Sequence, residues 1–266
     1  GPTKNTDTVF VGNPDDVNNF TAHNGTNVLI GGSLQDTFVG GKGKDDFVGG
    51  ANVDTLTGGL GVDTYVFDGS EHAVAGYADL ATDTIAEDDA TNPQKPENAI
   101  VIRDVHGTGV RLPMVFEIEA AGITGNVENT PTTLKSVFHG TVPNIGRVSV
   151  ALSDSTFRFT NDWNYNFEIQ RRILVAALSD NNRFKPDSDL ESALFVESGT
   201  HESIGKVYLD FSAVTADLLF EIEANGKVSV TRQMIVQGEI VEVKVRAENV
   251  HNLMGGRGNN TFVFDG

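Results

Sequence analysis

The chain of 266 residues has no cysteine, one tryptophan and only 19 basic residues against 37 acidic ones. The absence of cysteine excludes a framework of disulfide bonds. The net charge of −18 argues against nucleic acid and anionic membrane surfaces as partners, because both repel an acidic protein. No apolar run approaches the ~18 residues of a membrane-spanning helix, and no signal peptide opens the chain. The length is ample for one large domain or two.

Known catalytic motifs are also missing. The chain has no GxSxG nucleophile elbow, and His201-Glu202 lacks the second histidine of an HExxH zinc motif. Its glycine-rich part lacks the Gly-Lys-Ser/Thr ending of a phosphate-binding loop. The chain has so many carboxylates that their number does not exclude a glycosidase-like catalytic pair, but nothing in the sequence marks one. We therefore expect that the chain is not an enzyme.

A repeat of nine residues dominates the N-terminal part, in the four copies Gly31–Val39, Gly40–Val48, Gly49–Thr57 and Gly58–Val66. Positions one and two are always glycine, position six is always aspartate, and position eight is always large and apolar. Glycine permits positive φ and close backbone approach, so the first six residues can form a tight turn with inward carbonyls. The apolar residue then fills a narrow core from the middle of a short strand; these residues are Phe38, Phe47, Leu56 and Tyr65.

Two such units make a coil of eighteen residues, so turns that are eighteen residues apart stack on each other. Asp36 then pairs with Asp54, and Asp45 pairs with Asp63. Two carboxylates at a strand spacing of about 4.8 Å repel by roughly 3 kcal/mol at an effective dielectric constant of about 20. A hard cation with several oxygen ligands turns this repulsion into ligation, which favours calcium over magnesium.

The four copies resemble the hemolysin-type calcium-binding repeats of the RTX family, whose GGxGxDx-apolar-x nonapeptide winds a parallel β-roll. The resemblance implies that position-six aspartates and turn carbonyls of two stacked turns hold each ion. It implies a tighter site from Gly40–Asp45 with Gly58–Asp63, and a weaker one from Gly31–Asp36 with Gly49–Asp54, where Leu34 replaces a turn glycine. The metal-site residues so implied are Asp36, Asp45, Asp54, Asp63, Asn27, Gly31, Ser33, Gly40, Gly41, Lys42, Gly43, Gly49, Ala51, Gly58, Gly59, Leu60 and Gly61. A glycine-rich solenoid without metal is the alternative.

The repeat fades at both ends. Ala22–Ile30 and Asn13–Thr21 are weakened copies with asparagine at position six, and Gly255–Val263 is another copy, with Asn260 there. The segments 58–69 and 255–266 align without a gap. This self-similarity indicates tandem duplication, so we expect the chain to be a fragment of a longer array.

The expected fold is mainly all-β: a parallel β-roll of calcium-binding repeats with a β-sandwich or a widened β-solenoid. The expected divisions are a β-roll at 1–69, a linker or surface loop at 70–98, a β-rich domain at 99–248 and a degenerate repeat at 249–266. Alternation predicts antiparallel strands in the third part. Periodicity predicts a helical insertion over about 167–196, with helices at Phe167–Leu178 and Ser188–Phe195.

The resemblance implies a calcium-binding structural module of a secreted or cell-surface bacterial protein, adhesin-like, that leaves by type I secretion and folds on calcium outside. Its partners are calcium, neighbouring repeat units of the parent protein and an extracellular receptor or glycan. One alternative is a calcium-dependent module that binds carbohydrate or protein through an aromatic cluster; this cluster contains Phe157, Phe159, Trp163, Tyr165 and Phe167. Such a stripe is otherwise the buried face of a hairpin. The other alternative is an accessory region of an RTX epimerase or lyase, with Arg171 or Arg172 beside an acidic and aromatic groove.

Overall fold

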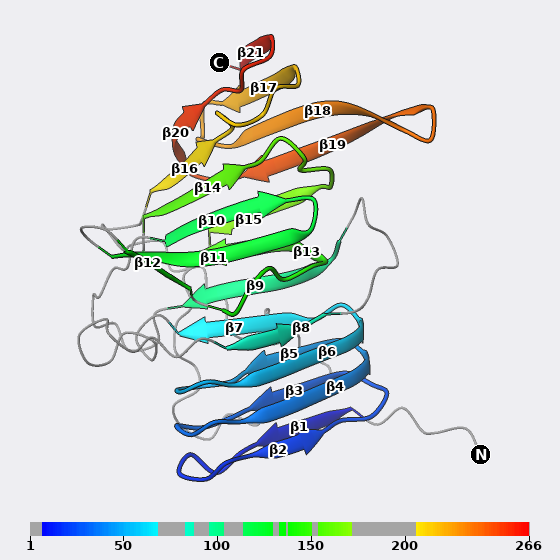
Figure 1. Cartoon of the computed structure of the whole chain (residues 1–266), viewed down its shortest axis with the longest axis vertical. Coiled ribbons are helices and arrows are strands. Elements are labelled where there is room, and N and C mark those ends of the chain that lie inside the picture. The colour runs from blue at the N-terminus through cyan, green and yellow to red at the C-terminus, as the bar shows by residue number, and fades with distance from the viewer. Residues whose placement is uncertain are drawn as a thin grey trace.

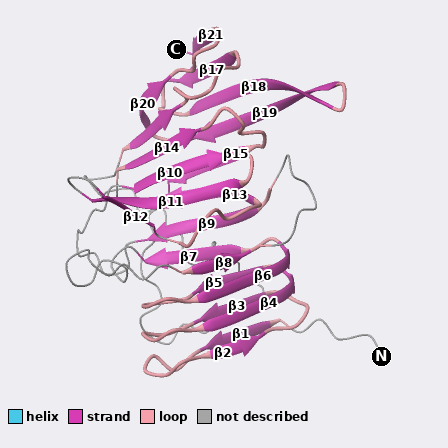
Figure 2. Ribbon diagram, in the orientation of Figure 1, coloured by secondary structure: helices cyan, strands magenta, loops and turns pink. Residues whose placement is uncertain are grey.

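A computed structural model of the chain describes residues 7–68, 83–87, 96–103, 114–129, 133–136, 138–150, 154–171 and 206–265. Every regular element in these ranges is a strand, and none of them is a helix (Figure 2). The all-β class predicted from the sequence is therefore confirmed.

The strands form three sheets. The largest has the order β1 (Thr8–Val11), β3 (Asn27–Ile30), β5 (Asp45–Val48), β7 (Thr64–Asp68), β9 (Asn98–Arg103), β13 (Ile145–Val150), β15 (Phe167–Arg171), β19 (Glu239–Ala247), β18 (Val228–Val236), β17 (Leu218–Glu223), β21 (Asn260–Asp265). A second contains β12 (Thr133–Ser136), β11 (Gly122–Asn129), β10 (Met114–Glu119), β14 (Ser155–Phe159), β16 (Val207–Asp210) and β20 (Val250–Met254). The smallest contains β2 (Asn19–Thr21), β4 (Thr37–Gly43), β6 (Thr55–Gly61) and β8 (Thr84–Ala86).

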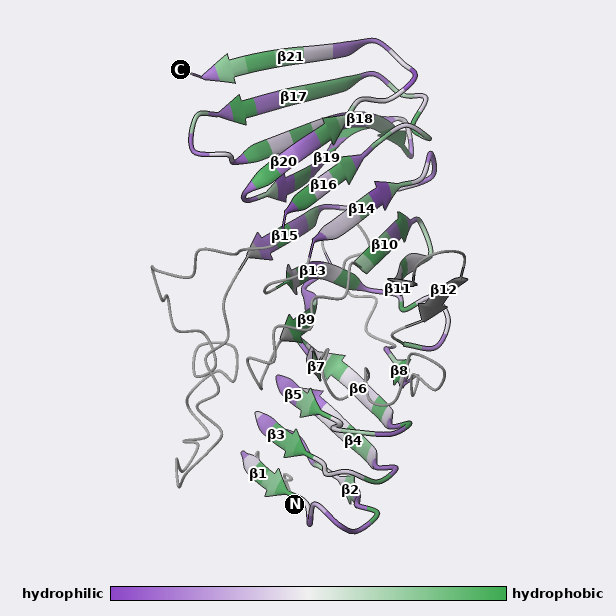
Figure 3. Ribbon diagram, turned by 90° about the vertical axis from the view of Figure 1, so that its left-hand side faces the viewer, coloured by the Kyte–Doolittle hydropathy of each residue, from purple (hydrophilic) through white to green (hydrophobic). Residues whose placement is uncertain are grey.

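The chain winds by crossing between two layers. From β1 to β9 the odd-numbered strands join the largest sheet and the even-numbered strands join the smallest, so each coil adds one parallel strand to both layers (Figure 1). Figure 3 shows the two layers from the side. Strands and glycine-rich connections alternate, as the nonapeptide predicts. The strands are longer than predicted in the smallest sheet, because β4 and β6 continue through the glycines of the next repeat as far as Gly43 and Gly61, which pair with each other. The spacing of eighteen residues per coil is confirmed, because Phe38 lies opposite Leu56, and Phe47 opposite Tyr65.

Apolar side chains between the layers form one long core, and a smaller cluster contains Val28, Val48, Val66 and Val101. The position-eight residues Phe38, Phe47, Leu56 and Tyr65 are completely buried there. Rings on successive coils stack, with centroids 5.2 Å apart for Phe47 and Tyr65 and 4.4 Å apart for Phe159 and Phe211. Stacked aromatic pairs add about 0.5–1.5 kcal/mol each beyond the burial of their area. The core therefore fixes the register that aligns the turns outside it.

Beyond β9 the structure differs from the predicted antiparallel region. The strands β9, β13 and β15 pair in parallel in one layer, and β10, β14 and β16 pair in parallel in the other. Among the described strands, antiparallel ladders join β10, β11 and β12 and join β17, β18 and β19, and an isolated antiparallel bridge links Ile123 to Val142. Alternation in the sequence shows which face of a strand is buried but says nothing of the direction of its neighbour.

The predicted helix over Phe167–Leu178 was wrong where the structure describes it. Phe167–Arg171 is β15, which pairs in parallel with β13 and β19. Phe167 and Ile169 point into the core, so this stretch follows the period of a strand. The rest of the predicted helical insertion lies outside the described residues.

The range 70–98 also differs from a linker or surface loop where it is described. Thr84–Ala86 is β8, which pairs with β6, and the flanking Asp83 and Glu87 are buried. β7 pairs directly with β9, so the largest sheet continues across this range without a break. The two layers therefore bring the side chains of Asp83, Glu87 and Asn98 onto the end of the repeat block.

Candidate metal centre

Two rows of polar side chains line the turns on opposite edges of the repeat block. The first row contains Asn27, Asp45, Asp63 and Asn98, and the second contains Asn18, Asp36, Asp54 and Asp83. All eight side chains are buried. Burial of charged groups is costly unless a partner compensates the charge, so these rows are the natural candidates for a cation site.

Hydrogen bonds along the rows confirm the predicted pairings of the aspartates. The backbone N–H of Asp36 donates to Asp54 Oδ1 at 2.7 Å, and that of Asp45 donates to Asp63 Oδ1 at 2.9 Å. In the same way the backbone N–H of Asp63 donates to Asn98 Oδ1 at 2.8 Å. One oxygen of each such side chain is therefore used by the neighbouring coil.

Asparagine and aspartate behave differently at position six of the turn. The Asn27 amide donates to the carbonyl oxygens of His23 and Gly25, at positions two and four of its own turn. The Asn260 amide donates to the same two positions, the carbonyl oxygens of Gly256 and Gly258. An ionised aspartate has no hydrogen to donate. In turns with aspartate, a cation can take the place of the amide and join the carboxylate to the turn carbonyls.

Asp45 and Asp63 carry oxygens that nothing compensates. Both side chains are fully buried, and neither Oδ2 atom has a hydrogen-bond partner. Burial raises the pKa of Asp45 from 3.8 to about 6, and burial together with the charge of Asp45 raises the pKa of Asp63 to about 7. In the second row, by contrast, Asp36 Oδ2 accepts the backbone N–H of Gly32 at 2.8 Å. The first row therefore has the greater need for a cation.

The turn glycines make room for these carboxylates. A Cβ atom on Gly40 would lie 2.3 Å from Asp45 Oδ2, and one on Gly58 would lie 2.4 Å from Asp63 Oδ2. At position four, Gly43 and Gly61 have φ of 131° and 144°. Asn52, at position four of the third copy, also adopts positive φ, at 74°, which asparagine tolerates. The position-one glycines are therefore required by the side chain at position six.

Comparison with known protein families, curated proteins and solved structures gave no match. The interpretation of the rows therefore depends on their geometry and on the repeat itself.

The sequence did not reveal three buried polar residues at the ends of the rows, namely Asp83 and Asn98, which belong to them, and Glu87, which lies beside Asp63. The Asp54 backbone N–H donates to Asp83 Oδ1 at 2.9 Å, so Asp83 continues the second row. A signal was present, because Asp83-Thr84-Ile85 repeats the sequence pattern of Asp54-Thr55-Leu56. This segment lacks the two glycines that begin each repeat, so it does not match the nonapeptide pattern.

No other site stands out in the described ranges. They contain no cluster of three or more His, Asp or Glu side chains suited to a metal, so any cation there needs carbonyl ligands as well. No helix with the length and hydrophobicity of a membrane span occurs in these ranges. The aromatic cluster is buried in the core, with Trp163 fully covered, and offers no exposed stripe for a sugar. Arg171 ends β15, and Arg172 lies outside the described residues.

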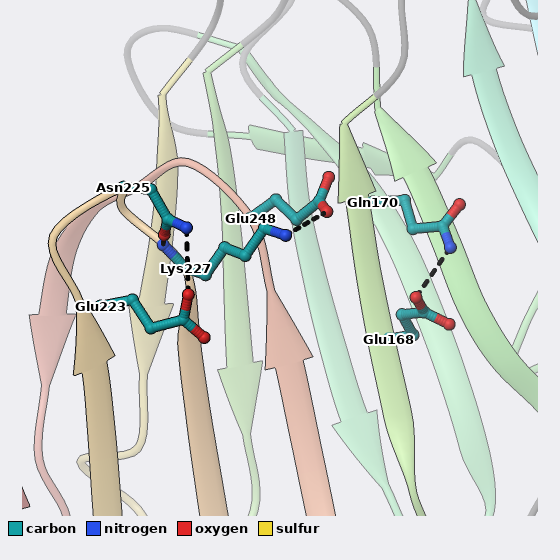
Figure 4. Close-up of polar contacts among 6 residues, drawn as sticks. All are labelled: Glu168, Gln170, Glu223, Asn225, Lys227 and Glu248. Atoms are coloured by element: carbon teal, nitrogen blue, oxygen red, sulfur yellow. Dashed lines mark hydrogen bonds and ion pairs between the residues drawn. The ribbon is translucent and has the colours of Figure 1, made fainter. Parts of the chain in front are cut away.

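Acidic side chains farther along the stack are of another kind. Around the β17–β18 turn, Asn225 donates to Glu223 at 3.0 Å, and Lys227 lies 3.9 Å from Glu248 (Figure 4). These side chains are exposed, and exposed pairs of this kind contribute about 0–1 kcal/mol. They leave no buried charge without compensation, which distinguishes them from the two rows.

Proposed function

We propose that the turns of the repeat block bind calcium, with Asp45 and Asp63 at the principal site. The observation that carries the proposal is the contrast at position six: the Asn27 amide donates to two carbonyls of its own turn, whereas an ionised aspartate has no hydrogen to donate to them, and Asp45 and Asp63 each bury a carboxylate oxygen without a partner. The candidate ligands in the two turns, carboxylates and backbone carbonyls, all bind through oxygen, which suits calcium. The ligands would be the two carboxylates and turn carbonyls from Gly40–Gly43 and Gly58–Gly61.

The parallel winding of the block supports the finer assignment, a β-roll of the RTX kind. Turns of nine residues alternate between two parallel sheets, and equivalent positions stack every eighteen residues. On this assignment the chain is a structural module of a secreted or cell-surface bacterial protein. Calcium is scarce inside cells and plentiful outside, so the acidic turns would wind only after export. Extracellular modules bind calcium at about 10⁻⁴–10⁻³ M, which is sufficient for such a switch.

Titration calorimetry tests the proposal directly. We expect the metal-free chain to bind calcium with a dissociation constant of roughly 10⁻³ M or lower. Magnesium at the same concentrations should give little heat, because it is smaller, demands octahedral geometry and retains its waters. Absence of calcium binding in the millimolar range, or equal binding of the two ions, would contradict the proposal.

The last strand of the largest sheet supports a second part of the proposal, that neighbouring repeat units pair edge to edge. Tyr65 and Phe67 in β7 are buried because β9 pairs alongside them. The matching residues Phe262 and Phe264 in β21 are 44% and 72% exposed. β1, at the opposite edge, runs in the same direction as β21, so the β1 edge of a second copy fits β21 in parallel.

In sedimentation velocity with calcium, we expect the average mass of the chain to rise with concentration. Phe264→Glu should reduce this association strongly, since a charge on an edge strand blocks pairing. Ile235→Glu is the matched control, because Ile235 is similarly exposed, at 78%, but lies in the β18–β19 hairpin. A chain that stays monomeric at high concentration, or equal effects of the two substitutions, would refute edge pairing.

A further inference from the structure

We propose that Glu87 and Asp63 form an additional calcium site at the end of the first row, outside the nonapeptide block. The inference rests on the proposed calcium binding of the rows. Glu87 belongs to none of the four repeats, and its role follows from where the fold places it.

The register of β8 brings Glu87 to the first position of the next turn. β6 and β8 pair in parallel, with Thr57 opposite Ala86. The next residue after each is Gly58, at position one of its repeat, and Glu87. The first row meanwhile continues from Asp63 to Asn98, which carries no charge. The Glu87 carboxylate at position one therefore supplies a charge next to Asp63 where Asn98, at position six, supplies none.

Three side-chain oxygens converge beside the Cα atom of Gly58. The point where a Cβ of Gly58 would lie is 2.3 Å from Glu87 Oε1 and 2.4 Å from both Asp63 Oδ2 and Tyr65 Oη. Any two of these oxygens are therefore at most about 4.8 Å apart, the sum of two such distances. Two carboxylates at that separation repel each other, whereas a cation shared between them would bind both.

Neighbouring side chains hold Glu87 in place, but they carry no positive charge that would neutralise the carboxylates of Glu87 and Asp63. Tyr65 Oη donates to Glu87 Oε1 at 3.2 Å, and Asn98 Nδ2 donates to Glu87 Oε2. Asp63 Oδ2 is fully buried and accepts no hydrogen bond from a neighbouring amide or hydroxyl, and the side chain that interacts with Asp63 here is a second acid, Glu87. That oxygen is the independent sign of a missing ligand.

The test compares Glu87→Gln with the unaltered chain in titration calorimetry with calcium. We expect one ion fewer to bind per chain, while binding at the other sites is retained. Glu97→Gln is the control, because it removes the same charge from an exposed side chain close to the same turn. It should leave the number of bound ions unchanged. Circular dichroism in calcium establishes that both variants are folded.

Terbium luminescence gives a second measurement, because Tyr65 lies beside the site and can sensitise a bound terbium ion. Glu87→Gln should reduce the tyrosine-sensitised emission, and Glu97→Gln should leave it unchanged; the emission that remains comes from terbium at the site of Asp45 and Asp63. If Glu87→Gln binds as many calcium ions as the unaltered chain and retains the full emission, the additional site is disproved and the rest of the row stands. If the unaltered chain binds no calcium, the proposed function itself is wrong.

Discussion

In excess chelator at pH 8, the chain should lose most of the β-sheet circular dichroism that arises from residues 13–68, and calcium should restore it. Without a cation, Asp45 and Asp63 remain buried with an uncompensated oxygen each. An uncompensated buried charge costs several kcal/mol, which is comparable to the whole stability of a domain, about 5–15 kcal/mol. Each ion at a hundred times its dissociation constant returns about 2.7 kcal/mol. An unchanged spectrum in chelator would contradict calcium-dependent folding.

Lower pH should partly replace calcium in this experiment. The pKa of Asp45 is raised from 3.8 to about 6 and that of Asp63 to about 7, so the folded chain holds protons that the unfolded chain releases. The stability of the metal-free chain therefore falls as the pH rises from about 4 to about 7 and then levels off. Each pKa unit corresponds to about 1.4 kcal/mol, so ionisation of the two groups lowers the stability of the metal-free folded chain by several kcal/mol. In chelator, more sheet signal should survive at pH 5 than at pH 8, and the reverse order would refute this.

Replacing both Asp45 and Asp63 by asparagine should weaken calcium binding more than replacing Asp36 and Asp54. The first pair contributes two oxygens without partners, whereas Asp36 Oδ2 already accepts the Gly32 N–H. We expect a difference of about tenfold or more in affinity, or about 1.4 kcal/mol. Titration calorimetry on the two double variants measures it. Equal losses would overturn the ranking of the two sites.

The double variant of Asp45 and Asp63 should also change stability in a way that simple damage to the fold would not. Asn27 and Asn98 already occupy the first row, so asparagine fits its geometry. Asp45→Asn with Asp63→Asn should therefore raise stability in chelator while it removes most of the gain from calcium. Thermal unfolding with and without calcium separates the two effects. A variant that is less stable in chelator than the unaltered chain would argue that the carboxylates are structural in themselves.

The repeat block could be predicted in detail because each of its columns has one physical role. The large apolar residue at position eight predicted the core, and the period of nine residues predicted the pairing of Asp45 with Asp63. The end of the row could not be predicted in this way. Asn98 is thirty-five residues from Asp63 in sequence, and only the pairing of β7 with β9 brings them together. Glu87 depends likewise on the register of β8.

β15 was mispredicted for a different reason. Ile169 belongs both to an apolar set of helical spacing, with Ile173, and to an alternating set with Phe167. A short apolar stretch fits either period, and the parallel neighbours β13 and β19 decide between them. Long-range pairing of this kind leaves little trace in a local pattern.

The winding of the repeat block also sets a length. Each coil of eighteen residues lengthens the stack by one strand spacing, about 4.8 Å. The same eighteen residues, fully extended, span roughly 60 Å. A coil that unwinds therefore releases a length of chain more than ten times the height that it adds to the folded stack. A cation bound between two turns thus controls how far apart the two ends of the block can lie.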